Sequence, residues 1–143
     1  MAVKKTILID PKIQAKWFSR VRDAHQMETT EDYVELIADL IHANKEARLS
    51  DLAERFGVSH PTANKVVARL QKEEYVISQP YRSIFLTPKG EELAKKCKER
   101  HQIVLDFLIR LGVPEDVAEA DAEGIEHHIS QKTLRIFEES LKK

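Results

Sequence analysis

The sequence has 143 residues, of which 42% are hydrophobic and 33% are charged, and its formal net charge is -1. This balance is typical of a water-soluble globular protein and differs from that of a disordered or fibrous chain. No apolar run approaches the roughly 20 residues of a membrane span, and the first residues lack the apolar core of a signal peptide. We therefore expect a cytoplasmic protein that makes no membrane contact, and the lone Cys97 excludes an internal disulfide.

The charge is distributed unevenly along the chain. Residues 1–90 carry 14 basic and 12 acidic side chains, whereas residues 91–143 carry 9 basic and 12 acidic ones. Contact with nucleic acid is thus favoured in the first part, and the surplus of carboxylates in the second part suits bound cations.

The first expected helix begins with Asp10 as its N-cap and Pro11 in its first turn. Apolar residues then recur at helical spacing over 13–24 and again over 33–41, with two threonines between the series. Either threonine is able to cap a new helix, so the pattern is compatible with one long helix or with two in line. The role of the segment before Thr29 stays open.

Two short helices and a hairpin are expected next. The first helix runs from Ser50, as its N-cap, to Phe56 and ends at Gly57, and the second runs from Ser59 to about Glu74. Strand-like triplets at 76–78 and 84–86 flank a turn that contains proline. Helix, turn, helix and hairpin is the order of a winged helix-turn-helix, whereas the two helices alone fit a helical hairpin equally well.

The exposed start of the second short helix carries residue types that reach base edges and phosphates, and an arginine sits at the tip of the wing. The predicted DNA-contacting residues are Ser59, His60, Pro61, Thr62, Asn64, Lys65, Arg69 and Arg82.

Three further helices are expected, from Thr87-Pro88 to Leu111, from Pro114 to about His128, and from Ser130 onward. The fold class is therefore mainly α with a small β-hairpin wing. An apolar stripe over 103–111 exceeds what one short lobe needs, so we assign part of it to a dimer interface.

Two helical segments each present carboxylates three residues apart, and a histidine directly follows the second pair. Each piece alone is most often a solvated face, but together with a histidine of the long helix they supply four carboxylates and two imidazoles, enough for a two-metal site. The candidate ligands are Asp32, Glu35, His101, Glu123, Glu126 and His127.

Electrostatics suggests how such a site acts as a switch. Two carboxylates about 4 Å apart repel by roughly 4 kcal/mol at an effective dielectric of about 20. Without a cation the helices should separate, and a divalent ion should draw them together. Because Asp32 and Glu35 belong to the helix that leads into the DNA-binding lobe, cation binding should lock that lobe against the C-terminal one.

Four stretches carry a family resemblance: Glu31–Glu35, the helix-turn-helix over 50–70, Arg100-His101 and Ala122–His128. Together they resemble the diphtheria toxin repressor family in its manganese-responsive branch. The resemblance covers about residues 30–137 and implies a winged helix-turn-helix DNA-binding domain followed by a helical metal-binding and dimerisation domain. We expect residues 1–90 to hold an N-terminal extension and the DNA-binding domain, and residues 91–143 to hold the second domain.

The resemblance also implies a function. It implies a homodimeric transcriptional repressor that binds about two Mn²⁺ per chain in a binuclear site built from the six candidate ligands, and that binds a double-stranded operator to control manganese-uptake genes. It implies no catalytic role. His25, His42 and His128 match no ligand position of the family and are interpreted as non-ligating.

Two alternatives stay open. A winged-helix regulator that senses a small organic ligand predicts DNA binding that is indifferent to chelators. A dimetal carboxylate enzyme needs an open coordination position and a substrate pocket, and the sequence offers no nucleophile or acid–base pair beyond the ligands themselves.

Overall fold

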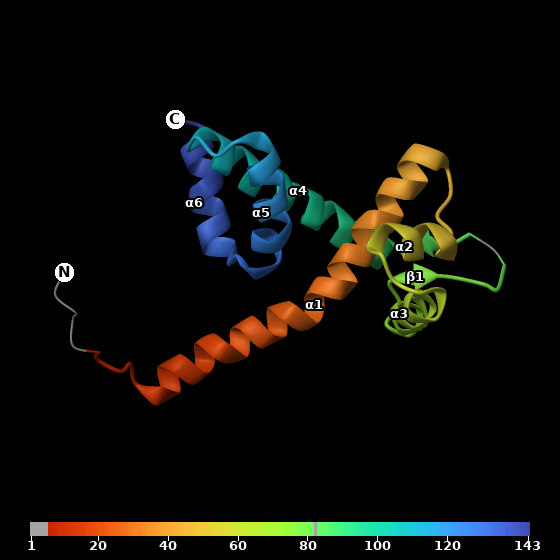
Figure 1. The fold of residues 1–143 in the computed structure, drawn as a ribbon, viewed down its shortest axis with the longest axis horizontal. Coiled ribbons are helices and arrows are strands. Elements are labelled where there is room, and N and C mark those ends of the chain that lie inside the picture. The colour runs from red at the N-terminus through yellow and green to blue at the C-terminus, as the bar shows by residue number, and fades with distance from the viewer. Residues whose placement is uncertain (1–5, 82) are drawn as a thin grey trace.

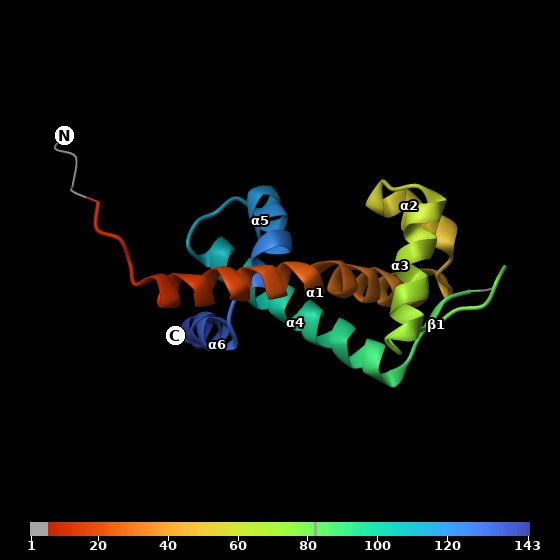
Figure 2. The same cartoon turned by 90° about the horizontal axis from the view of Figure 1, so that it is seen from below.

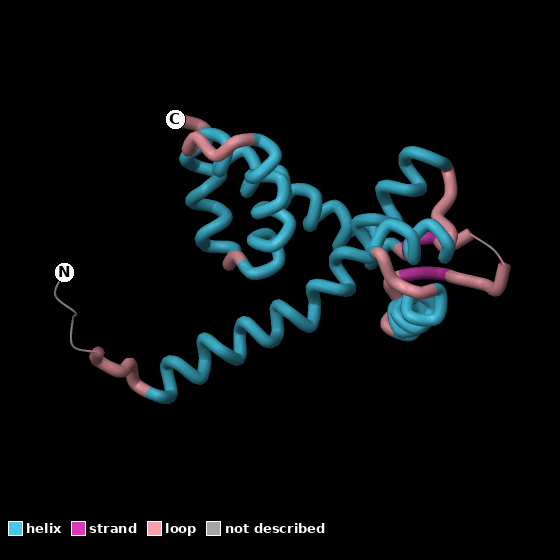
Figure 3. Tube along the Cα trace, in the orientation of Figure 1, coloured by secondary structure: helices cyan, strands magenta, loops and turns pink. Residues whose placement is uncertain are grey.

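The computed structural model describes residues 6–81 and 83–143, which form six helices and one two-stranded hairpin (Figures 1 and 3). The elements are α1 Pro11–Asn44, α2 Leu49–Phe56, α3 His60–Lys72, β1 Val76–Ile77, β2 Phe85–Leu86, α4 Pro88–Arg110, α5 Glu115–His128 and α6 Gln131–Leu141. The predicted class, mainly α with a small hairpin wing, is confirmed. None of the helices described has both the length and the apolar character needed to cross a membrane.

Helix α1 is one continuous helix of 34 residues, which resolves the choice that the sequence left open. The Asp10 carboxylate accepts a hydrogen bond from the Lys12 amide at 2.8 Å, and Pro11 occupies the first turn. No break occurs at the threonine pair: both threonines lie within the helix, and the side chain of Thr30 is buried. Figure 2 shows that α1 passes both lobes of the molecule, and its N-terminal half extends away from the lobe that contains α2 and α3.

The N-terminal lobe is built around the second half of α1. Helix α2 and strand β2 contact it, α3 packs against α2 and β1, and β1 pairs antiparallel with β2. Its fully buried core side chains include Ile37, Leu52, Leu70, Val76 and Ile84. This packing fixes the orientation of α3 and of the hairpin beside it.

The start of α2 differs from the prediction. The helix begins at Leu49 with Arg48 as its N-cap, so the assignment of Ser50 as the N-cap was wrong. The Asp51 carboxylate accepts a hydrogen bond from the Arg48 amide at 3.3 Å. This contact fixes the N-cap two residues before the predicted one. The end of α2 is as expected, because Gly57 adopts a φ of 67° that favours glycine.

The C-terminal lobe consists of α5 and α6 packed on the second half of α4. Val104, Ala118 and Leu134 form its core, and the rings of Phe107 and Phe137 stack at 3.9 Å. Much of the apolar stripe of α4 is therefore used inside this chain. Leu111, at its end, stays 67% exposed.

Gly90 and Gly124 offer a matched pair of stability tests. A Cβ at Gly90 would lie 2.2 Å from the Tyr75 carbonyl oxygen, whereas a Cβ at Gly124 meets nothing within 4 Å. Gly90→Ala should lower the free energy of unfolding by about 1–3 kcal/mol through overpacking. Gly124→Ala should raise it by up to about 1 kcal/mol, because alanine favours helix. Urea unfolding of the metal-free protein measures both, and equal midpoints would contradict the close packing of α4 on Tyr75.

Candidate functional site

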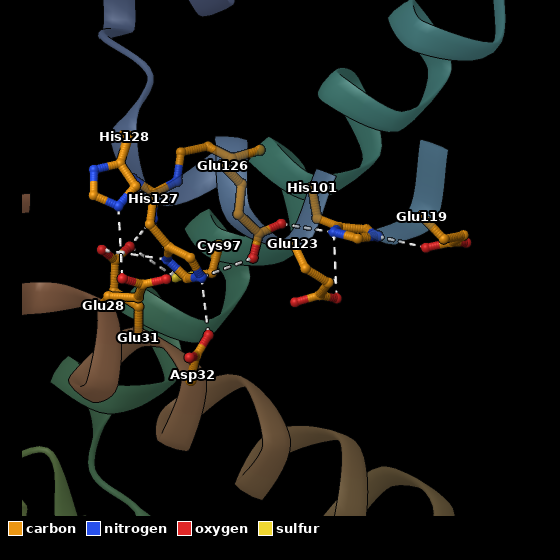
Figure 4. A network of polar contacts seen from close by, with 11 residues as sticks. Glu28, Glu31, Asp32, Cys97, His101, Glu119, Glu123, Glu126, His127 and His128 are labelled. Carbon is orange, nitrogen blue, oxygen red and sulfur yellow. Dashed lines mark hydrogen bonds and ion pairs between the residues drawn. The ribbon is translucent and has the colours of Figure 1, made fainter. Parts of the chain in front are cut away.

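Four of the six candidate metal ligands meet between α1 and α5. Asp32, Glu123, Glu126 and His127 each place one ligand atom within 4.8 Å of the others. His127 Nε2 lies 2.8 Å from Asp32 Oδ1 and 3.4 Å from Glu126 Oε1 (Figure 4). Glu126 and His127 are buried, although a carboxylate is rarely buried without a partner charge.

His101 joins this cluster from α4. Its Nδ1 lies 2.6 Å from Glu126 Oε2 and 3.6 Å from Glu123 Oε1, so α4 contributes to the site together with α1 and α5 (Figure 4). Its Nε2 lies 3.0 Å from Glu119 Oε2, a contact that the sequence analysis missed. The available signal was spacing, because Glu119 stands one helical turn before Glu123 on the same face of α5.

Glu35 lies at the edge of the cluster. It lines a shallow pocket together with Asp32 and Glu123. One of its carboxylate oxygens, Oε2, is buried and has no hydrogen-bond partner among the described residues. The structure thus joins five of the candidate ligands by direct contacts and leaves the sixth facing them across a pocket.

The cluster holds four carboxylates but only two imidazoles. Burial, together with Glu35 and Glu123, raises the pKa of Glu126 to about 7, and its Oε1 is also without a hydrogen-bond partner in the part of the chain that is described. Burial and Glu123 likewise raise the pKa of Glu35. Burial lowers the pKa of His127, but the hydrogen bond and charge of Asp32 outweigh it and raise the value.

Each of these shifts has the sign expected where a cation is needed, because protons occupy positions that a positive ion would fill. The donor set is hard carboxylate oxygen with imidazole nitrogen, which fits Mn(II). The residues present therefore fit the metal that the sequence pattern implies.

A buried ion pair lies next to the cluster, and it was not predicted from the sequence. Glu31 is 5% exposed and pairs with Arg100 of α4. Cys97 donates its thiol to Glu31 Oε2 at 3.3 Å. Burial, followed by nearby carboxylates, raises the pKa of Cys97 to about 12, which keeps the thiol protonated in the metal-free protein.

A groove separates α3 from the hairpin of the N-terminal lobe. Two predicted DNA-contacting residues, His60 and Asn64, line it one turn apart. Arg48 and Tyr81 also line the groove, and neither was predicted. Tyr81 stands at the hairpin turn with a φ of 61° and a fully exposed side chain.

The remaining predicted DNA-contacting residues have different surroundings. Ser59 caps α3 by accepting the Thr62 amide at 3.2 Å and donates to the Thr62 hydroxyl at 2.9 Å. Arg69 lies 3.5 Å from Glu73. The others, Pro61 and Lys65, are exposed on α3, and Arg82 lies outside the described residues.

Two family models match the chain. The model described as "Iron dependent repressor, N-terminal DNA binding domain" matches residues 25–84. The model described as "Iron dependent repressor, metal binding and dimerisation domain" matches residues 87–143.

Relatives with similar sequences are regulators of transcription. The chain is 49% identical over 134 residues to "Transcriptional regulator MntR" of Salmonella typhimurium, and the matched region covers 94% of this chain and 85% of the relative. It is 41% identical over 117 residues to "HTH-type transcriptional regulator MntR" of Bacillus pumilus, which spans 77% of this chain and 81% of that relative.

Solved structures share the fold. The manganese regulator SloR matches with a TM-score of 0.69 and 27% identity over 78% of this chain and 53% of the other. A manganese-dependent transcriptional repressor in complex with manganese matches with a TM-score of 0.72 and 27% identity over 78% of this chain and 52% of the other. This chain spans about half the length of these two chains.

The raised pKa of Glu126 predicts how the stability of the metal-free protein depends on pH. Between pH 4.5 and about 7 the folded state keeps a proton that the unfolded chain releases. The free energy of unfolding falls with rising pH wherever the folded state binds more protons. One such group contributes a slope of up to about 1.4 kcal/mol per pH unit.

Urea unfolding across this range, with chelator present, should show a steeper decline for wild type than for Glu126→Gln. Parallel pH profiles of the two proteins would contradict a protonated Glu126 in the metal-free state.

Proposed function

The chain belongs to the iron-dependent repressor family, and from this premise we propose that it is a manganese(II)-dependent transcriptional repressor. In this proposal it binds promoter DNA in the cytoplasm as a metal-loaded homodimer and controls manganese-uptake genes. The observation that carries the proposal is the convergence of Asp32, Glu123, Glu126 and His127 between α1 and α5, together with buried carboxylate oxygens that have no hydrogen-bond partner among the described residues.

The metal centre is proposed to be binuclear. Asp32, Glu123, Glu126 and His127 would hold one Mn(II), since their ligand atoms converge. The second would lie among Glu35, His101, Glu123 and Glu126, because His101 contacts both carboxylates of α5 and Glu35 faces Glu123 across the pocket. The bound ions supply the positive charge that these carboxylates lack.

Helix α1 transmits occupancy of the site to the DNA-binding surface. It carries Asp32 and Glu35, and its second half packs against α2 and β2 of the N-terminal lobe. When the carboxylates of α1 and α5 are held together, α1 is fixed against the C-terminal lobe and so is the lobe that presents α3. The coupling is therefore a differential stabilisation of one arrangement of the two lobes.

In a homodimer, the arrangement of the two lobes sets the distance between the two α3 helices. We divide the chain into a DNA-binding part, residues 1–90, and a metal-binding and dimerisation part, residues 91–143. Exposed apolar side chains suited to the partner include Trp17 and Phe18 on α1 and Leu111 after α4. A two-fold dimer presents two α3 helices to half-sites about 34 Å apart, so a fixed lobe arrangement sets that spacing.

The two alternatives differ in their support. The relatives are regulators of transcription, which leaves no support for a dimetal enzyme. A regulator of organic-ligand type would bind DNA equally well with and without chelator, so the DNA-binding measurement below separates it from the manganese proposal.

A Mn(II) titration followed by the EPR signal of the free ion tests the metal centre. Wild type should bind about two ions per chain, and Glu126→Ala should lose at least 10- to 100-fold in affinity, because a buried ligand shared by both positions is removed. Asp121→Ala is the matched control, since Asp121 is an exposed carboxylate of α5 outside the cluster. Equal binding by wild type and Glu126→Ala would overturn the proposed centre.

Fluorescence anisotropy of a labelled promoter fragment tests the DNA surface. Lys65→Ala should weaken binding to all sequences and reduce the dependence of log affinity on log salt by about one, as expected for one lost phosphate contact. Lys132→Ala on α6 is the control, because this exposed lysine lies in the other lobe. Chelator should abolish the signal, and binding that survives chelator would favour the organic-ligand alternative.

A further inference from the structure

A second cluster of metal-binding side chains lies beside the first. His25 and Glu28 of α1 meet His128 at the end of α5, and one ligand atom of each lies within 4.8 Å of the others. His25 Nδ1 is 3.2 Å from Glu28 Oε2, and His128 Nε2 is 3.5 Å from the same oxygen. Figure 4 shows Glu28 and His128 pointing toward each other.

The spacing of these atoms suits a coordinated ion. Zinc binds imidazole nitrogen and carboxylate oxygen at about 2.0–2.2 Å in a tetrahedron, which places neighbouring ligand atoms about 3.3–3.5 Å apart. The two separations from Glu28 Oε2, 3.2 Å and 3.5 Å, lie within about 0.1 Å of this range. The imidazole rings of His25 and His128 are stacked at 6.4 Å with an angle of 28°, so the two rings lie side by side at this carboxylate.

The cluster is separate from the manganese site and open to solvent. Its three residues do not belong to the four-residue cluster, and the intervening carboxylate of Glu31 is engaged by Arg100. The side chain of His25 is 78% exposed, that of His128 35% and that of Glu28 27%. An ion held here therefore has access from solvent and keeps a position for water.

We propose that His25, Glu28 and His128 form an additional cation site that takes a divalent transition ion with a preference for nitrogen, of the Zn(II) kind. Two imidazoles and one carboxylate match the ligand set of three-ligand zinc sites. The same set disfavours Mn(II), which stands at the weak end of the affinity series. Occupancy ties the first part of α1 to the end of α5. This site goes beyond the proposed manganese function and does not depend on it.

Zinc titration calorimetry on the full chain tests the proposal. The comparison is wild type, His25→Ala and His42→Ala, where His42 is another exposed histidine of α1, outside the cluster. His25→Ala should bind one Zn(II) fewer per chain, or bind one of its ions at least tenfold more weakly. His42→Ala should match wild type, and Glu28→Gln should repeat the loss.

A parallel Mn(II) titration by EPR separates this site from the proposed manganese centre. His25→Ala should keep the wild-type Mn(II) count and affinity. Zn(II) binding by His25→Ala equal to that of wild type in number and affinity would overturn the additional site. A fall in Mn(II) binding that accompanies the zinc loss would also overturn it, because the cluster would then be part of the manganese centre.

Discussion

The excess of buried carboxylate between α1 and α5 is the constraint on which the arrangement of the two lobes depends. Glu126 is fully buried beside His127, and Asp32 faces both from the other helix. Arg100 neutralises Glu31 beside the cluster, but Glu35 Oε2 and Glu126 Oε1 are buried and have no hydrogen-bond partner among the described residues. Bringing these groups together without an ion costs free energy, and protons taken up at raised pKa values offset only part of it.

This constraint has structural consequences because of where α1 runs. One helix of 34 residues supplies ligands near its middle and packs with the N-terminal lobe further along. A rigid element that crosses both lobes converts a change at the carboxylates into a change in the position of α3. A flexible joint at the threonine pair would absorb that change, but α1 continues as a regular helix through both threonines.

The sequence predicted those features that are local. Spacing along a helix placed Glu123, Glu126 and His127 on one face, and glycine and proline positions located the helix ends. Contacts between side chains of different helices could not be predicted, because the register of α1 against α4 depends on packing between residues that are far apart in the sequence. The pairing of Glu31 with Arg100 and the contact of Glu119 with His101 belong to this class. The continuity of α1 could not be decided from the sequence, because either threonine satisfies a capping pattern.

Adjacent ligand sets of different chemistry follow from the geometry of one helix pair. Going back along α1, carboxylates recur about one turn apart, from Glu35 through Asp32 to Glu28, while α5 ends in two successive histidines. The first histidine turns inward to a carboxylate-rich, buried cluster, and the second turns outward to one carboxylate and another imidazole. Burial and carboxylate number favour a hard cation in the first position, and imidazole number favours a nitrogen-preferring ion in the second. Under these two proposals, discrimination between metals along this interface results from the helical positions of two neighbouring histidines, because consecutive residues of a helix point about 100° apart.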